Sequence, residues 1–120
     1  MNAKQFLIVC RRAPYGDSFA REALDTAMAA AAFDQRVALL FLGDGVTQLL
    51  RAQDAAAIGQ KTFEKQLGAL PLYDINTIYA DQAALEQRHF GADDLSLPAE
   101  LLDLDAIIAL IAGSDITLNF

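Results

Sequence analysis

The chain has 120 residues, of which 54% are apolar, so it is long and apolar enough to fold as one domain around a core. Nine Lys and Arg residues stand against sixteen Asp and Glu residues, and the formal net charge is −7. Binding to nucleic acid or to anionic lipid depends on cations, so we expect no direct contact with either. The single cysteine excludes an internal disulfide. The apolar run at residues 6–10 is far too short for a membrane span or a signal peptide, and we expect a cytoplasmic domain.

The first half of the chain predicts two buried strands with a helix between them. Residues 6–10 (FLIVC) form a continuous apolar run, which is typical of a strand that is buried on both faces. Asp17 or Ser18 can cap the helix that follows, in which apolar residues recur at helical spacing. Residues 37–42 (VALLFL) predict the second buried strand, and the glycine turn at residues 43–45 ends it.

The next part of the chain continues the alternation of helices and strands. Residues 54–70 predict a helix that stops at Pro71, and residues 75–80 predict a third strand. Residues 82–89 predict a short helix, and residues 93–97 a loop or a short strand.

The last quarter of the chain contains its most apolar segment. Pro98 can open a helix at the first helical position. Residues 106–112 (AIIALIA) are apolar at every position, so periodicity alone does not distinguish a strand from a helix. We expect a helix, because Asp103 or Asp105 can cap it and Gly113 can end it. With a closing strand, the whole chain predicts a single α/β domain with a parallel sheet of about five strands and helices on both faces.

Polar, ionisable side chains follow each of the first three predicted strands. The carboxyl ends of parallel strands meet at one edge of a sheet, where open α/β folds place their sites. Arg12 and Tyr15 follow the first strand, Asp44 the second and Asp81 the third. We therefore treat these residues as candidates to line a pocket at the carboxyl edge. As an acid and base pair, the two carboxylates would need shifted pKa values.

The familiar cofactor motifs are incomplete in this chain. The turn at residues 43–45 resembles a dinucleotide fingerprint, but Gln48 stands where the third glycine belongs. Residues 59–62 (GQKT) resemble the end of a phosphate loop but lack the glycine directly before the lysine. One histidine, His89, and one cysteine, Cys10, do not make a clustered zinc site. We expect neither a metal nor a bound cofactor.

The apolar content exceeds what one face of a small core can take up. The end of the first predicted helix and residues 106–112 are apolar on all sides. Exposed patches of this kind usually mark a protein partner. Ala30, Phe33 and Ile108 are therefore candidates for contacts with another chain. The alternative is that they belong to the core of an unusually apolar small domain.

Several short segments resemble the TusC/DsrF branch of the DsrE-like sulfur-relay proteins. They are residues 12–16 (RAPYG), 22–25 (EALD), 31–35 (AAFDQ), 40–46 (LFLGDGV), 48–49 (QL) and 72–74 (LYD). The resemblance runs from about residue 6 to residue 120, and the two glycine turns at this spacing are its most specific part. It implies a flavodoxin-like or Rossmann-like subunit. That subunit assembles with TusD/DsrE-like and TusB/DsrH-like subunits, two of each, into a heterohexamer.

The resemblance also implies a role. In that family the complex accepts persulfide sulfur from TusA and passes it to TusE for 2-thiouridine synthesis at tRNA wobble positions, whereas DsrEFH relatives serve sulfur oxidation. The sulfur-carrying cysteine belongs to the TusD/DsrE subunit, just after the third strand. The matching place here holds Asp81, which cannot form a persulfide. The resemblance thus implies a subunit without catalytic residues of its own, whose chemistry lies on a neighbouring subunit.

Three alternatives stay open at this point. The chain can be a DsrF-like subunit of a sulfur-oxidation complex. It can be a stand-alone enzyme or small-ligand-binding α/β domain that uses the carboxyl edge with the turn at residues 14–16, Asp44 and Asp81. It can also be a sulfurtransferase that uses Cys10, whose pKa Arg11 and Arg12 would lower if the thiol were exposed.

Overall fold

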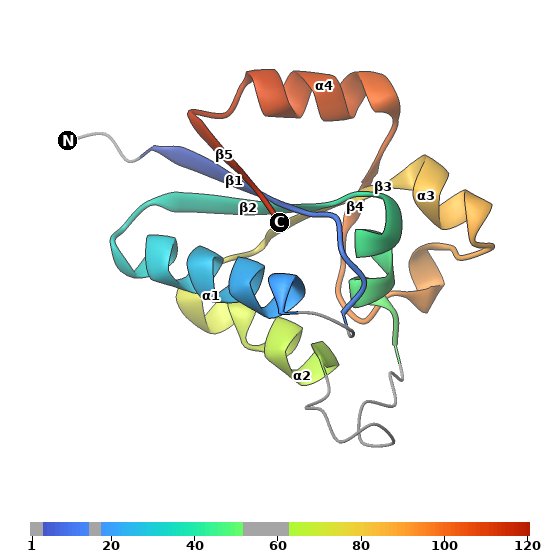
Figure 1. The fold of residues 1–120 in the computed structure, drawn as a ribbon, viewed down its shortest axis with the longest axis horizontal. Helices are drawn as coiled ribbons and strands as arrows, with labels where there is room; N and C mark the ends of the chain where they lie inside the picture. Colours follow the sequence, from blue (N-terminus) through green and yellow to red (C-terminus); the bar gives the residue numbers. More distant parts are fainter. Residues whose placement is uncertain (1–3, 15–17, 52–62) are drawn as a thin grey trace.

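The computed structural model of the chain describes residues 4–14, 18–51 and 63–120. Five parallel strands form one sheet in the order β4-β3-β2-β1-β5, which confirms the predicted parallel sheet (Figure 1). The strands are β1 (Gln5–Cys10), β2 (Arg36–Phe41), β3 (Thr77–Asp81), β4 (Glu100–Leu102) and β5 (Ile116–Asn119). The two most apolar strands, β1 and β2, lie side by side inside the sheet, where both of their faces are covered.

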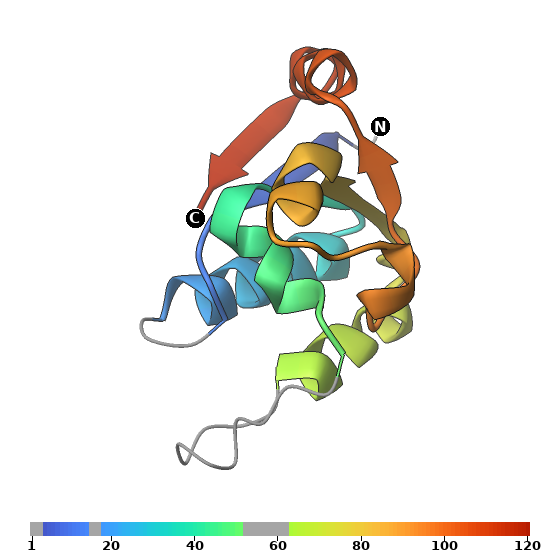
Figure 2. The ribbon, with the colours of Figure 1, turned by 90° about the vertical axis from the view of Figure 1, so that its right-hand side faces the viewer.

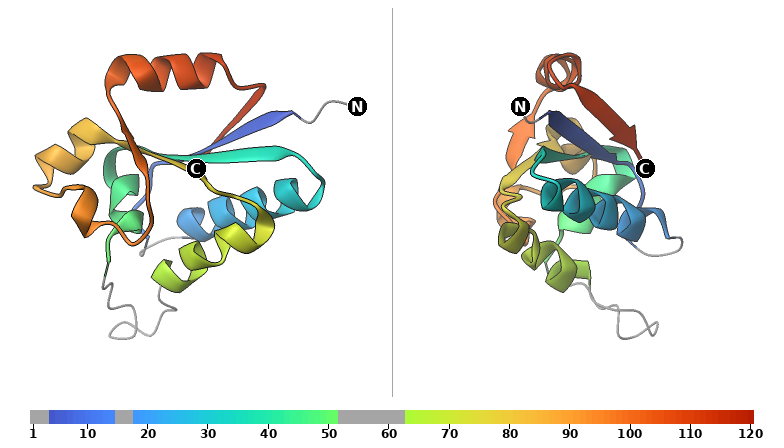
Figure 3. Two further views of the ribbon diagram at one scale, coloured as in Figure 1. Left: turned by 180° about the vertical axis from the view of Figure 1, so that it is seen from behind. Right: turned by 90° about the vertical axis from the view of Figure 1, so that its left-hand side faces the viewer.

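Helices cover both faces of the sheet. The α-helices are α1 (Phe19–Ala32), α2 (Phe63–Gly68), α3 (Gln82–Gln87) and α4 (Leu104–Ala112), and the 3-10 helices are η1 (Gly43–Leu49), η3 (Leu70–Tyr73) and η4 (Ala92–Asp94). Figure 3 shows α1 and α2 against one face and α4 against the opposite face. Of the helices in the described part of the chain, α4 is the one that covers this second face (Figure 1).

Two separate cores explain why the strands are continuously apolar. Successive side chains of a strand point to opposite faces of the sheet. Ile8 and Cys10 of β1 pack with Leu24 of α1, whereas Leu7 and Val9 pack in the cluster that contains residues of α4. A strand between two helical layers therefore needs an apolar residue at every position.

The predicted helix over residues 106–112 is present, and its predicted caps are in place. The backbone N–H of Ala106 donates to Oδ1 of Asp103 at 2.9 Å, and Gly113 directly follows the last helical residue. Ile107 is buried against the sheet. The N-terminal cap of α1 is different: Ser18 occupies the N-cap position, but its side chain makes no capping hydrogen bond. Asp17 lies outside the described residues.

The prediction that Pro98 opens a helix is wrong. Residues Glu100–Leu102 form strand β4 instead, in parallel register with Tyr79–Asp81 of β3. Three residues are too few to show a strand period, and a proline fixes φ at a value that suits extended backbone as well as helix. Pairing with β3 decides the outcome, and no local signal in the sequence reports that pairing.

Candidate functional site

The carboxyl edge of the sheet brings together most of the candidate residues. The register aligns Cys10 with Phe41 and Phe41 with Ala80, so β1, β2 and β3 end at the same edge. Arg12 and Asp44 come shortly after β1 and β2, and Asp81 is the last residue of β3. Figure 2 shows η1 and α3 side by side at this edge. Tyr15 and residues 59–62 lie outside the described residues.

The glycine turn after β2 is pressed against the end of β1. The N–H of Leu42 donates to the carbonyl oxygen of Cys10 at 3.0 Å, and the N–H of Gly45 donates to the carbonyl of Leu42 at 2.8 Å. A Cβ atom at Gly45 would lie 1.9 Å from the Cys10 carbonyl oxygen. Gly43 has a φ of +52°, a conformation that favours glycine. Backbone geometry therefore accounts for both glycines without a bound phosphate.

Gln48 ties the segment after β1 to η1. Its side chain is fully buried, and its Nε2 donates to the carbonyl oxygen of Arg12 at 2.7 Å. The guanidinium of Arg12 lies over the ring of Phe19, 4.8 Å from the ring centroid, which is the geometry of a cation–π contact. The sequence offers Gln48 as the residue that breaks a dinucleotide motif and as part of the family resemblance at residues 48–49. Its structural role depends on a residue 36 positions away, which no local pattern shows.

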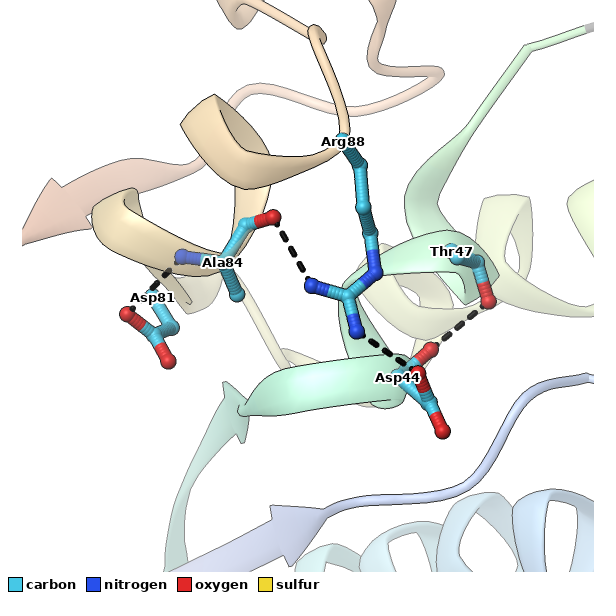
Figure 4. A network of polar contacts seen from close by, with 5 residues as sticks. All are labelled: Asp44, Thr47, Asp81, Ala84 and Arg88. Carbon is cyan, nitrogen blue, oxygen red and sulfur yellow. Dashed lines mark hydrogen bonds and ion pairs between the residues drawn. The ribbon is translucent and has the colours of Figure 1, made fainter.

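The two edge carboxylates are held by separate structural contacts (Figure 4). Asp44 Oδ1 forms an ion pair with an Arg88 guanidinium nitrogen at 2.6 Å. Another nitrogen of that guanidinium donates to the carbonyl of Ala84 at 2.9 Å. Asp81 caps α3, because its Oδ1 accepts from the N–H of Ala84 at 3.3 Å.

This arrangement does not pair the two carboxylates as acid and base. Figure 4 shows Asp44 and Asp81 apart, with Ala84 and Arg88 between them. Asp44 is 72% exposed, so its ion pair with Arg88 contributes less than about 1 kcal/mol to stability. The ion pair of Asp44 with Arg88 links η1 to the end of α3, whereas Asp81 caps the start of α3. A hollow of about 700 Å³ lies at the opposite edge, where the strands begin, and Arg36, Thr77 and Tyr79 line part of it.

Cys10 is buried in the core on the α1 face. Its side chain is 1% exposed, and burial raises the pKa of the thiol to about 12. The thiolate, which is the nucleophilic form, is therefore scarce at neutral pH. This burial agrees with the predicted buried strand at residues 6–10 and speaks against the alternative of a Cys10-dependent sulfurtransferase.

The raised pKa of Cys10 predicts a pH dependence of stability. Below pH 9.0 the thiol keeps its proton in both states, but between pH 9.0 and about 12 it ionises only in the unfolded chain. Unfolding then releases a proton, so the free energy of unfolding falls as the pH rises through this window. We expect the difference in unfolding free energy between wild type and Cys10→Ala to shrink by about 1.4 kcal/mol between about pH 8 and about pH 10.

Urea unfolding of both proteins at the two pH values measures this effect. The other ionisable side chains are the same in both proteins, so their contributions cancel in the difference. If the difference in unfolding free energy between the two proteins stays constant with pH, water reaches the Cys10 thiol in the folded state.

The three interface candidates lie in different environments. Phe33, at the end of α1, is 78% exposed, and Ile108, on α4, is 57% exposed. Ala30 is half-buried and packs against the core on the α1 face. A charge at Ala30 would therefore perturb folding together with any contact to a partner, whereas Phe33 and Ile108 separate the two effects.

Neither a metal cluster nor a membrane span is found within residues 4–14, 18–51 and 63–120. In these ranges no three His, Cys, Asp or Glu side chains are grouped so that they could hold a metal ion. No helix there has the length and apolar character that a bilayer crossing requires.

Comparisons with known sequences point to one family. The model of the DsrE/DsrF-like family matches residues 4–120. The chain is 47% identical over 92 residues to the intracellular sulfur oxidation protein DsrF of Allochromatium vinosum, which is 77% of this chain and 68% of that protein. It is 37% identical to a TusC homolog of Pseudomonas aeruginosa, over 94% of this chain and 95% of the homolog. A TusC homolog of Vibrio vulnificus is 34% identical over 97% of this chain and 98% of the homolog.

A solved structure supports the fold independently. The crystal structure of the ychN protein from E. coli superposes with a TM-score of 0.84 and covers 98% of this chain and 99% of that one. Its sequence identity is 21%, so this likeness is evidence for the fold alone.

Proposed function

The chain belongs to the DsrE/DsrF-like family, and from this membership we propose that it is a non-catalytic subunit of a sulfur-relay complex. The single observation that carries the proposal is that neither of the two candidate sulfur positions offers a reactive thiol. Asp81, at the place that matches the family's sulfur cysteine, has no thiol and caps α3. Cys10, the only cysteine, is buried with a pKa raised to about 12. The persulfide chemistry then lies on a TusD/DsrE-like partner.

The relatives that match over nearly their full length favour a TusBCD-type complex. Two TusC homologs align with 94% and 97% of this chain. In this role the chain assembles with TusD-like and TusB-like subunits, and the complex relays persulfide sulfur from TusA to TusE for 2-thiouridine synthesis in tRNA. The net charge of −7 supports a subunit that binds other proteins and does not itself bind tRNA.

A specific observation supports a second candidate. The relative named as the sulfur oxidation protein DsrF has 47% identity, higher than the 37% and 34% of the two TusC homologs. In that role the same non-catalytic subunit belongs to a DsrEFH-type complex. Deleting the gene distinguishes the two roles: loss of 2-thiouridine from tRNA supports the first, and unchanged tRNA with impaired sulfur oxidation supports the second.

Co-expression with TusD-like and TusB-like chains, followed by incubation with a persulfide donor, tests the proposal. We expect the three chains to purify together, and mass spectrometry to find a gain of about 32 Da, one sulfur atom, on the TusD-like chain. Cys10→Ala and Cys10→Ser are the matched controls, and both should leave sulfur transfer unchanged. An adduct on Cys10 that disappears in these variants together with transfer activity would refute the non-catalytic role.

A further inference from the structure

The outward side of α4 carries an apolar ridge that the described part of the chain leaves uncovered. Leu104, Ile108 and Ile111 are 70%, 57% and 36% exposed, and they follow one another at spacings of four and three residues. These spacings place them on one side of the helix. The adjacent side of the helix, with Ile107 and Leu110, packs against the sheet. A helix that is apolar all round is normally a buried helix.

The ends of the ridge are acidic. Asp103 and Asp105 lie at the first turn, and Asp115 follows the helix by three residues. All three are exposed, and the last turn of α4 contains no basic residue. Within α4 and its flanking residues, 103–115, every charged side chain is therefore acidic, whereas the adjoining hollow contains both Asp34 and Arg36.

This charge pattern distinguishes between a second copy and a different partner. If two copies of α4 packed antiparallel, Asp103 and Asp105 of one copy would approach Asp115 of the other. A parallel arrangement would bring identical carboxylates together. Each copy also has a net charge of −7. Like charges placed opposite each other suppress association, whereas a basic rim on a different protein would complement them.

The surface next to the ridge can enlarge the contact. The hollow of about 700 Å³ lies beside the carboxyl end of α4 and is lined by Ala109 and Leu110 of α4 and by Tyr73 and Tyr79. Three aliphatic side chains alone cover less than the roughly 800 Å² per partner of a stable interface. Tyrosines are enriched at the centre of interfaces, so the hollow is a suitable extension of the ridge.

We propose that the α4 ridge, with the adjoining hollow, docks into an apolar groove rimmed by Lys and Arg on a non-identical subunit of the complex. This proposal rests on the proposed function, since it assigns the surface by which the chain joins its partners. The contact is a helix-in-groove contact, with Leu104, Ile108 and Ile111 as the apolar anchors.

Native mass spectrometry of the co-expressed three-chain complex, with variants of this chain, tests the docking surface. We expect Ile108→Glu to reduce the assembled fraction at least about tenfold, because it places a carboxylate in the apolar groove. Asp105→Lys should weaken assembly more at low salt than at high salt, because it removes attraction to a basic rim. Leu72→Glu is the matched control: Leu72 is 85% exposed but lies on η3, and this variant should assemble within about twofold of wild type.

Each outcome separates this proposal from the proposed function. The thermal unfolding temperature of the isolated Ile108→Glu chain should match that of wild type. The loss of assembly is then not caused by misfolding of this chain. A complex that forms normally with Ile108→Glu would overturn the docking surface and leave the subunit role intact. A wild-type chain that never assembles would overturn the subunit role itself. A wild-type homodimer that Ile108→Glu dissociates would assign the ridge to a second copy and overturn the proposed partner.

Discussion

Gly45→Ala is expected to destabilise the domain by about 3 kcal/mol or more, a large part of the roughly 5–15 kcal/mol that holds a domain together. The added Cβ would lie 1.9 Å from the Cys10 carbonyl oxygen, 2.7 Å from the Cys10 carbonyl carbon and 3.2 Å from the Arg11 Cα. All three are backbone atoms at the end of a strand inside the sheet, so no side chain can move aside. Relief of the clash requires η1 to move away from β1.

Two other glycines provide matched controls for this prediction. Gly43→Ala meets no atom within 4 Å, but its φ of +52° should cost about 1–2 kcal/mol. Gly91→Ala also meets no atom within 4 Å and has a φ of −118°, so its effect should stay within about 0.5 kcal/mol. Urea unfolding of the three variants should rank them in this order. A Gly45→Ala protein as stable as Gly91→Ala would show that η1 does not lie against β1.

Asp81→Cys is expected to create a reactive thiol in a chain whose native thiol is inert. Asp81 is half-buried at the carboxyl edge, whereas Cys10 is 1% exposed. A thiol with an ordinary pKa of 9.0 is about one tenth ionised at pH 8, whereas a pKa of about 12 leaves about one part in ten thousand ionised. We therefore expect residue 81 to react with a thiol reagent about a thousandfold faster than Cys10.

Stopped-flow labelling with a disulfide reagent measures both thiols in the same molecule. Asp81→Ser is the matched control, because serine also caps helices and adds no thiol. The loss of the capping carboxylate in Asp81→Cys should cost about 1 kcal/mol, so the domain should stay folded. Labelling of Asp81→Cys no faster than that of Asp81→Ser would show that this edge of the sheet is closed to small thiol reagents.

Local patterns were sufficient for the elements with strong periodic or apolar signals. The runs at β1 and β2 predicted buried parallel strands because both faces of each strand meet helices. Asp103 and Gly113 marked the ends of α4 correctly, because capping depends on residues close in the chain. Strand β4 was missed, because three residues pair with β3 through contacts that no window of sequence contains.

In the candidate site too, local sequence patterns predict the placement of residues but not the contacts between distant ones. The alternation of strands and helices was enough to bring Arg12, Asp44 and Asp81 to one edge of the sheet. Sequence did not reveal that Asp44 pairs with Arg88, since the two residues are 44 positions apart. It also did not reveal that Asp81 caps α3 or that the buried Gln48 holds the segment after β1. Because of these contacts, the two edge carboxylates have structural roles and do not form an acid and base pair.

The sequence by itself determined the fold class, the family and the absence of a thiol after the third strand. These properties depend on residue identity and on short-range periodicity, which the chain displays directly. Only the tertiary structure decided that Asp44 pairs with Arg88, that Gly45 must lack a side chain and that α4 turns an apolar side outward. Ion pairing, close approach and exposure depend on which distant segments pack together, and that packing arises only when the whole chain folds.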